Sequence, residues 1–211
     1  MLFGTWANAA AAERAIAAVR DPSNFHWSIL TLFALVMTTY CTEIKAKNYK
    51  AVASAAMLYS IHWLYEIANA VICHFTGYAL WTVSPESTSF ILLIGVSAEL
   101  SLMFSVAGFT CKLLPEDKNA KILGMNSRVF MGIAFAAFCS VFEIFLAWTP
   151  AFIWVYPWWG ALPVFITTYI PFFVGAYLVY DLPLKKQIIA VGSLVTLNII
   201  LLATLIPLGI I

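Results

Sequence analysis

Six long apolar runs alternate with short polar connections along this chain of 211 residues. The runs, each near the length of a membrane span, cover residues 26–44, 51–75, 89–111, 129–149, 161–181 and 188–211. A helix needs roughly 20 apolar residues to cross the hydrocarbon core of a bilayer. A helix also satisfies its own backbone hydrogen bonds, which lipid cannot do for it. The pattern therefore predicts an all-α integral membrane protein, a helical bundle with six transmembrane helices.

The segment before the first run has a different pattern. Residues 5–20, TWANAAAAERAIAAVR, are rich in alanine and mildly amphipathic, and Asp21 and Pro22 follow them. Such a helix favours the membrane interface, and the residue before a proline rarely stays helical. We expect an N-terminal interfacial segment over residues 1–25 and a six-helix transmembrane domain over residues 26–211.

Positive charge lies mostly on one side of the expected bundle. Nine basic residues fall in the first, third and fifth connections: Lys45, Lys47, Lys50, Lys112, Lys118, Lys121, Arg128, Lys185 and Lys186. Only Arg14 and Arg20 fall on the other side. Because cytoplasmic loops carry the excess of Lys and Arg, these three connections are predicted to be cytoplasmic and both termini to lie outside. The host membrane would be the cytoplasmic membrane or that of the endoplasmic reticulum.

Tryptophans gather on the side opposite to the lysines. Seven of the eight are there: Trp6, Trp27, Trp81, Trp148, Trp154, Trp158 and Trp159, with Trp63 as the exception. Trp is enriched where a bilayer meets water, so an interfacial aromatic belt is expected there. The connection WTPAFIWVYPWWG, residues 148–160, adds prolines to these rings. It would serve either as a lid over the outer end of the bundle or as an aromatic anchor.

Composition excludes a soluble protein. Hydrophobic residues make up 63% of the chain and charged residues 10%, and the mean hydropathy is +0.93. A soluble domain needs far more charge to cover its surface. The net charge of +1 gives no indication of a nucleic-acid partner. The four cysteines are scattered singly through the apolar runs, which indicates reduced, buried thiols rather than disulfides.

Three carboxyl side chains lie inside apolar runs rather than between them: Glu66, Glu99 and Glu143. Counted from the basic ends of their runs, all three fall roughly 18–22 Å deep at about 1.5 Å per helical residue. A charge near the bilayer centre costs about 2.5 kcal/mol or more, so such residues face the interior of a bundle. Three hydrogen-bonding residues of the last two runs lie at or slightly below this depth: Thr167, Thr168 and Asn198. The sequence thus predicts a polar pocket in the middle of the bundle.

The second run carries the richest polar face. His62, Glu66 and Asn69 share one side of a helix because they are three and four residues apart. In the third run, Met103 shares a face with Glu99. We therefore name His62, Glu66 and Glu99 as the candidate catalytic residues. The candidate substrate-binding residues are Tyr59, Trp63, Tyr65, Asn69, Met103, Glu143, Thr167, Thr168 and Asn198.

These residue types together suit proton transfer in a dry cavity. A protonated carboxylic acid such as Glu66 is a proton donor there, and His62 one turn away can supply, receive or orient that proton. Glu99 could take a proton back or stabilise a cation. Aromatic faces such as those of Trp63 and Tyr65 attract cations. The combination points to protonation of a carbon–carbon double bond and proton loss elsewhere. Isomerisation or cyclisation of an isoprenoid or sterol-like lipid is chemistry of this kind.

Two motifs carry a family resemblance. HWLYE, with His62 and Glu66, and SAELSL, with Glu99 and Ser101, resemble the emopamil-binding-protein (EXPERA) family of sterol isomerases and lipid-ligand receptors. In that family a His and a Glu four residues apart on the second helix act with a Glu on the third. The resemblance covers about residues 26–181. It implies a lipid-like ligand and a proton-transfer role for these three residues.

The later runs depart from that family. The fifth run has Thr168 and Pro171 where the family carries an Asn and a Trp one turn apart, and the sixth run is extra. The second run is equally similar to the membrane-bound terpene cyclases of meroterpenoid pathways, which place an acidic residue beside a Trp. Those enzymes use an Asp on a seventh helix, whereas the last run here offers Asn198.

Other functions stay open at this level. A proton-coupled transporter would also bury carboxyls in mid-membrane, although the chain has no visible internal repeat. One His and three Glu could ligate a metal, but the HxxxE spacing alone is a weak signal, so neither metal nor cofactor is expected. A non-catalytic subunit of a membrane complex would use the carboxyls only to join helices. The expected partners are a lipid-like substrate and membrane lipids, with a homo-oligomer or a larger complex as further options.

Overall fold

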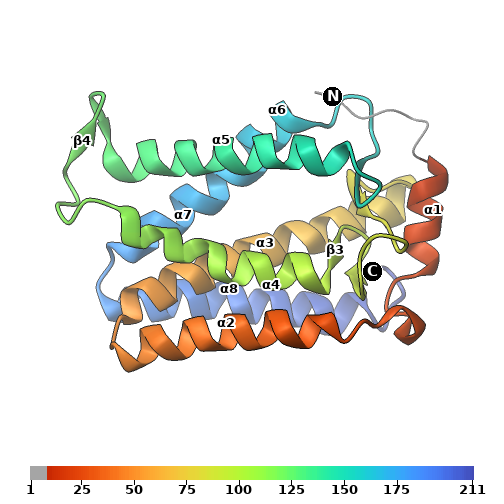
Figure 1. The fold of residues 1–211 in the computed structure, drawn as a ribbon, viewed down its shortest axis with the longest axis horizontal. Coiled ribbons are helices and arrows are strands. Elements are labelled where there is room, and N and C mark those ends of the chain that lie inside the picture. The colour runs from red at the N-terminus through yellow and green to blue at the C-terminus, as the bar shows by residue number, and fades with distance from the viewer. Residues whose placement is uncertain (1–8) are drawn as a thin grey trace.

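The computed structural model describes residues 9–211, which form a bundle of long helices with a small β-cap at one end (Figure 1). The main helices are α2 (Ser28–Lys45), α3 (Tyr49–Thr76), α4 (Ala98–Ala107), α5 (Ser127–Ala147), α7 (Ile170–Tyr180) and α8 (Leu184–Leu205). The 3₁₀ segment η3 (Gly108–Leu113) extends α4, and α6 (Ala161–Val164) and the π-helix η4 (Phe165–Tyr169) run directly into α7.

The remaining elements are short. At the start of the chain are α1 (Ala9–Ala17) and the 3₁₀ turn η2 (Pro22–Asn24). The β-cap consists of β1 (Trp81–Val83), β2 (Ile91–Leu93), β3 (Val96–Ser97) and β6 (Phe152–Trp154). A separate hairpin at the other end consists of β4 (Lys121–Ile122) and β5 (Met125–Asn126).

Helix α3 lies at the centre of the bundle. It packs against α4, α7 and α8, while α5 packs along α7. Small residues allow the close approaches: a Cβ atom on Gly108 of η3 would lie 2.5 Å from the Cα atom of Ala55. Phe172, Phe173 and Tyr177 of α7 fill the space between these helices and are almost fully buried.

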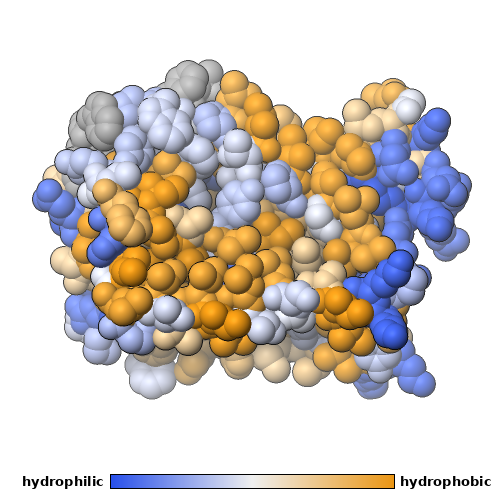
Figure 2. All heavy atoms as spheres, turned by 180° about the vertical axis from the view of Figure 1, so that it is seen from behind, coloured by the Kyte–Doolittle hydropathy of each residue, from blue (hydrophilic) through white to orange (hydrophobic). Residues whose placement is uncertain are grey.

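Within residues 9–211, three helical stretches are long and apolar enough to cross a membrane: α5, the continuous stretch Ala161–Tyr180, and α8. Helices α2 and α3 also cover most of the first two apolar runs. An apolar band crosses the middle of the molecule, and hydrophilic residues gather at the end with the β4–β5 hairpin (Figure 2). The prediction of a mostly helical membrane protein is therefore confirmed.

The helix expected over residues 89–111 is wrong in its first half. Strands β2 and β3 form an antiparallel hairpin there, and α4 begins only at Ala98. Ser97 is its N-cap, and the Ser97 hydroxyl accepts a hydrogen bond from the backbone N–H of Leu100 at 3.4 Å. A buried strand and a buried helix are both continuously apolar, so hydropathy alone does not separate them.

The β-cap closes the end of the bundle that also carries α1 (Figure 1). Strand β1 pairs antiparallel with β6, so the connection of residues 148–160 folds onto the cap. Helix α1 packs against β1, and Ala12 and Ala15 are buried there. Residues 5–8 of the expected interfacial helix lie outside the described residues.

The aromatic belt expected at this end is only partly present. Trp27, Trp148 and Trp158 are exposed. Trp81, Trp154 and Trp159 are buried in the β-cap, which contradicts the expectation that they face the interface. Their indoles are covered because the strands fold back over the helix ends. Trp6 lies outside the described residues.

Arg128 is buried at the opposite end, with 2% of its surface exposed. Its guanidinium donates to both carboxylate oxygens of Asp181, at 2.6 and 3.0 Å. It also donates to the carbonyls of Pro115 and Asp117, both at 2.9 Å. Each guanidinium nitrogen thus has an acceptor, which compensates the buried charge. The arrangement ties the third connection and the start of α5 to the end of α7.

We expect Asp181→Asn to lower the free energy of unfolding by about 3–5 kcal/mol, because it leaves the buried Arg128 guanidinium uncompensated. Unfolding of the purified protein in mixed micelles measures this. The matched control is Glu43→Gln at the same end, whose partner Lys112, 2.5 Å away, is half exposed. The control should lose less stability. Equal losses of unfolding free energy in the two variants would contradict the interpretation that Asp181 compensates the buried charge of Arg128.

Candidate functional site

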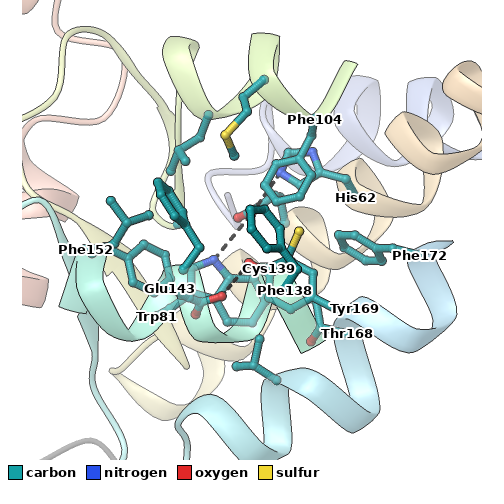
Figure 3. A pocket seen from close by; sticks show the side chains of 17 residues that line it. His62, Trp81, Phe104, Phe138, Cys139, Glu143, Phe152, Thr168, Tyr169 and Phe172 are labelled. Atoms are coloured by element: carbon teal, nitrogen blue, oxygen red, sulfur yellow. Dashed lines mark hydrogen bonds and ion pairs between the residues drawn. The ribbon is translucent and has the colours of Figure 1, made fainter. Parts of the chain in front are cut away.

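A cavity of about 240 Å³ lies in the half of the bundle next to the β-cap (Figure 3). Side chains of α3, α4, α5 and the α6–α7 stretch form its walls. Trp81, Gly95 and Phe152 of the β-cap close the end of the cavity next to the cap. Most of the lining is aliphatic or aromatic. Its polar and titratable side chains are His62, Glu66, Trp81, Cys139, Glu143, Thr168 and Tyr169.

The cavity opens sideways between α4 and α5. Met103 of α4 and Phe138 and Phe142 of α5 line it and are also 44%, 66% and 49% exposed. Residues that both line a cavity and reach the outside mark its mouth. Because these side chains are apolar, the mouth opens onto the apolar surface of the bundle rather than onto a polar end.

His62 and Glu66 stand one turn apart on α3, with Nε2 of the His 3.3 Å from Oε1 of the Glu. This contact lacks hydrogen-bond geometry, and both imidazole nitrogens are buried without a hydrogen-bond partner. The imidazole stacks on Phe104, with ring centroids 4.3 Å apart. Oε1 of Glu66 accepts a hydrogen bond from the indole of Trp81 at 3.3 Å, and its Oε2 is buried without a partner. The His62 and Glu66 side chains are therefore tightly packed, but only one of their four polar atoms has a hydrogen-bond partner.

The π-helix η4 brings Thr168 and Tyr169 to the cavity together. Pro171 has no N–H to offer the carbonyl of Thr167, and that carbonyl instead accepts from the hydroxyl of Tyr65 at 2.7 Å. The extra residue of a π-turn shifts the following side chains around the helix, and such turns often occur at functional sites. The Thr168 hydroxyl is buried at the cavity without a hydrogen-bond partner.

Glu143 of α5 faces the cavity from the other side and is fully hydrogen-bonded. Its Oε1 accepts from the indole of Trp154 at 2.6 Å, and its Oε2 from the hydroxyl of Tyr169 at 2.5 Å. The two donors come from the β-cap and from η4. They hold the carboxyl in one orientation at the wall of the cavity.

Glu99 does not line the cavity, so its expected place beside Glu66 is wrong. Its Oε1 accepts hydrogen bonds from the backbone N–H of Ser89, at 2.6 Å, and from the Ser89 hydroxyl. Because β2 and β3 occupy the first half of the expected helix, Glu99 falls in the first turn of α4. There it ties the loop before β2 to the start of that helix.

Three other candidates also lie off the cavity and join neighbouring elements. The side-chain amide of Asn69 donates to the carbonyl of Trp81 at 2.9 Å and accepts from the backbone N–H of Leu80 at 2.8 Å, which holds the start of β1. Tyr59 shares a hydrogen bond with Ser101 of α4 at 2.9 Å. Asn198 of α8 donates to the backbone carbonyl of Ser60 at 2.7 Å. These side chains connect α3 to the cap, to α4 and to α8.

Of the remaining candidates, Trp63, Tyr65 and Thr167 do not line the cavity, whereas Met103 does. Trp63 packs against the buried cluster of Ile67, Leu93 and Val96. The Thr167 side chain is exposed, and its hydroxyl donates to a carbonyl of its own helix at 2.7 Å. Tyr65 acts through the bond to η4 described above. Of the candidates on α4, Met103 is at the cavity mouth.

Sequence reasoning did not find many of the residues that line the cavity. Trp81, Phe104, Tyr169 and Phe172 all line the cavity. Pro171, inside an otherwise unbroken apolar run, was the available signal for a local change of helix geometry near Tyr169. No comparable signal marked Trp81, because its position depends on how β1 pairs. Among residues 9–211, no three His, Cys, Asp or Glu side chains form a group that could hold a metal ion.

The chain is similar to known proteins over most of its length. A protein of Archaeoglobus fulgidus described as "Uncharacterized protein" is 42% identical over 186 residues, which are 86% of this chain and 88% of that protein. No solved structure matches. The EXPERA family is not matched, so that resemblance stays a hypothesis. Residues 9–207 match the model of a family described as "Uncharacterized membrane protein family", and the chain belongs to that family.

Proposed function

We propose that this protein is a membrane-embedded enzyme that binds an isoprenoid or sterol-like lipid in the cavity. In this proposal the His62–Glu66 pair transfers a proton to a carbon–carbon double bond of that lipid. One observation carries it: both nitrogens of His62, Oε2 of Glu66 and the hydroxyl of Thr168 are buried without hydrogen-bond partners. A buried group left unsatisfied costs about 1–3 kcal/mol, so such atoms around one space indicate that a ligand completes them.

The cavity favours a lipid over a water-soluble ligand. Its lining is mostly aliphatic and aromatic, and its mouth between α4 and α5 lies on the apolar surface. A ligand could therefore enter from the hydrocarbon region without crossing water. The unsatisfied atoms of His62, Glu66 and Thr168 would meet its one polar or reactive part, while its apolar body fills the rest.

The proposed reaction moves a double bond. The Glu66 carboxylic acid gives its proton to one alkene carbon, the π electrons form the new C–H bond, and the neighbouring carbon becomes cationic. The rings of Phe104 and Phe172, which line the cavity, would stabilise that cation. An adjacent carbon then loses a proton to Glu143, and the C–H electrons form the new double bond. His62 passes a proton to the Glu66 carboxylate and takes one back from water, and Glu143 gives its proton to water, so each residue regains its starting state and no net proton is consumed.

A purely structural role fits Glu143 better than Glu66. Both oxygens of Glu143 accept hydrogen bonds from within the protein, as a group that joins helices would. Glu66 keeps one oxygen buried without a partner in the lining of the cavity, where a ligand could reach it. The choice between an enzyme and a non-catalytic subunit therefore rests on Glu66.

We further propose that six segments cross the membrane, with the basic end in the cytoplasm and both termini outside. The third segment is the short one: α4 with η3 covers residues 98–113, roughly 27 Å at the rises of the two helix types. The β2–β3 hairpin would extend this segment across the rest of the membrane. Non-helical backbone at such depth is tolerated where protein covers it, and β2 and β3 are mostly buried.

Cysteines placed at Lys47, Asn119 and Lys186 should react with a membrane-impermeant maleimide only from the cytoplasmic side. All three positions are exposed at the basic end. A cysteine at Glu86, which is exposed on the cap side, should react only from outside. The exposed native Cys41 is first replaced by Ser. Labelling of Lys47→Cys from outside would overturn the orientation.

Glu66→Gln should lower turnover by roughly 10²-fold or more while the melting temperature is retained. Gln keeps the shape and much of the hydrogen bonding but has no proton to transfer. The assay uses purified protein in lipid micelles with polyprenyl and sterol alkenes in heavy water. Mass spectrometry then detects deuterium in the carbon skeleton of the product.

The matched control is Glu99→Gln, the same change in a carboxyl of α4 that does not line the cavity. It should leave turnover unchanged. Full turnover in Glu66→Gln would end the acid–base proposal and favour the structural role. Turnover that instead follows the amount of bound metal in all variants would point to a metal site.

A further inference from the structure

Two tryptophans of the β1–β6 ribbon each reach a different buried carboxyl. Trp81 and Trp154 lie directly opposite each other in the antiparallel register. The indole of Trp81 donates to Oε1 of Glu66 at 3.3 Å, and the indole of Trp154 donates to Oε1 of Glu143 at 2.6 Å. Opposed residues of an antiparallel pair place their side chains on the same face, with Cβ atoms about 4.5–5.5 Å apart. One ribbon thus presents two neighbouring donors to α3 and α5.

The ribbon supplies something that helix packing does not. Helices α3 and α5 each pack along α7, which sets where their backbones lie. The terminal torsion of a Glu side chain is broad, so packing of the backbone leaves the carboxyl plane free to rotate. A hydrogen bond to one oxygen removes that freedom. It also decides where the second oxygen points.

The second oxygens of the two carboxyls differ in what they do. With Oε1 held by Trp81, Oε2 of Glu66 is left without a partner at the cavity. With Oε1 held by Trp154, Oε2 of Glu143 accepts from Tyr169. The ribbon therefore leaves Glu66 with a free oxygen, whereas both oxygens of Glu143 accept hydrogen bonds.

Trp81 is itself held in place from two sides. A Cβ atom on Gly95 would lie 2.4 Å from Nε1 of Trp81 and 2.6 Å from Oε2 of Glu66, so the hairpin backbone touches both partners. On the other side the Trp81 ring stacks on Trp159, with ring centroids 5.8 Å apart and planes 17° from parallel. Such confinement suits a group that orients another group.

We propose that Trp81 and Trp154 are positioning residues, which the β1–β6 ribbon carries as a pair to orient Glu66 and Glu143 for proton transfer. The inference rests on the proposed function, because it assigns these indoles a part in that reaction. It adds that the β-cap is part of the catalytic machinery and is not only a cover for the bundle.

The kinetic test compares Trp81→Phe and Trp154→Phe with Trp159→Phe. The control residue, Trp159, is buried beside the β-cap, and its indole nitrogen has no hydrogen-bond partner. Phe at this position keeps an aromatic ring that can stack on Trp81. We expect the first two variants to lower kcat roughly tenfold with KM little changed, because each loses a hydrogen bond to an acidic group. We expect Trp159→Phe to keep kcat. Equal kcat in all three variants and the wild type would overturn the inference.

A chemical test needs no turnover. Dicyclohexylcarbodiimide, which modifies protonated carboxyls in apolar sites, is added to each variant, and mass spectrometry reads the labelling rate at each Glu. Trp81→Phe should change the rate at Glu66 alone, and Trp154→Phe the rate at Glu143 alone, each several-fold. Unchanged rates, or an equal change in Trp159→Phe, would overturn the inference. Glu66→Gln turnover separately decides the proposed function, so failures of the two are distinguishable.

Should Trp81→Phe fold poorly, 3-benzothienylalanine at position 81 serves in its place. This residue keeps the two-ring shape and replaces only the N–H by sulfur. A selective change in labelling at Glu66 in the folded variant supports the orienting hydrogen bond. A rate at Glu66 equal to that of the wild type refutes it, since packing is then shown to hold the carboxyl without the donor.

Discussion

The need of buried carboxyls for hydrogen-bond donors is the constraint on which the cap half of this molecule depends. An unpaired polar group in a low-dielectric interior costs free energy that packing does not return. Glu66 lies ten residues from the end of α3 and Glu143 four residues from the end of α5, and both are buried. Their donors are the indoles of Trp81 and Trp154 and the hydroxyl of Tyr169. The two connections that carry those indoles therefore fold back over the helix ends and pair as a ribbon.

The same constraint makes the exceptions informative. At the basic end every guanidinium nitrogen of the buried Arg128 has a hydrogen-bond acceptor. These bonds tie connections to helices and leave no nitrogen of the group without a partner. Around the cavity, His62, Glu66 and Thr168 keep buried atoms without partners. In residues 9–211 the other unpartnered buried side-chain atoms belong to Glu99, Trp159, Gln187 and Asn198, one atom each, and none of these residues lines the cavity. The convergence of several such atoms on one cavity therefore indicates function there. The mouth between α4 and α5 gives that unsatisfied site an apolar entrance.

Local backbone chemistry connects these features. Pro171 deprives the Thr167 carbonyl of its helical donor, η4 takes π geometry, and Tyr65 supplies the missing hydrogen bond. As a result Thr168 and Tyr169 both reach the cavity, one with a free hydroxyl and one as a donor to Glu143. A single proline thus links helix geometry to the polar lining of the site.

The sequence by itself determined the helical runs, the clustering of basic residues at one end, and the shared face of His62, Glu66 and Asn69. These follow from hydropathy and from the 3.6-residue period, which act within one segment. Only the tertiary structure decided that β2 and β3 replace the start of the third expected helix, which carries Glu99 away from the cavity. It also decided that Trp81 and Trp154 are buried donors and that Tyr169 faces Glu143. The reason is physical: hydropathy reports that a side chain avoids water, but which buried group it meets depends on how distant segments pair.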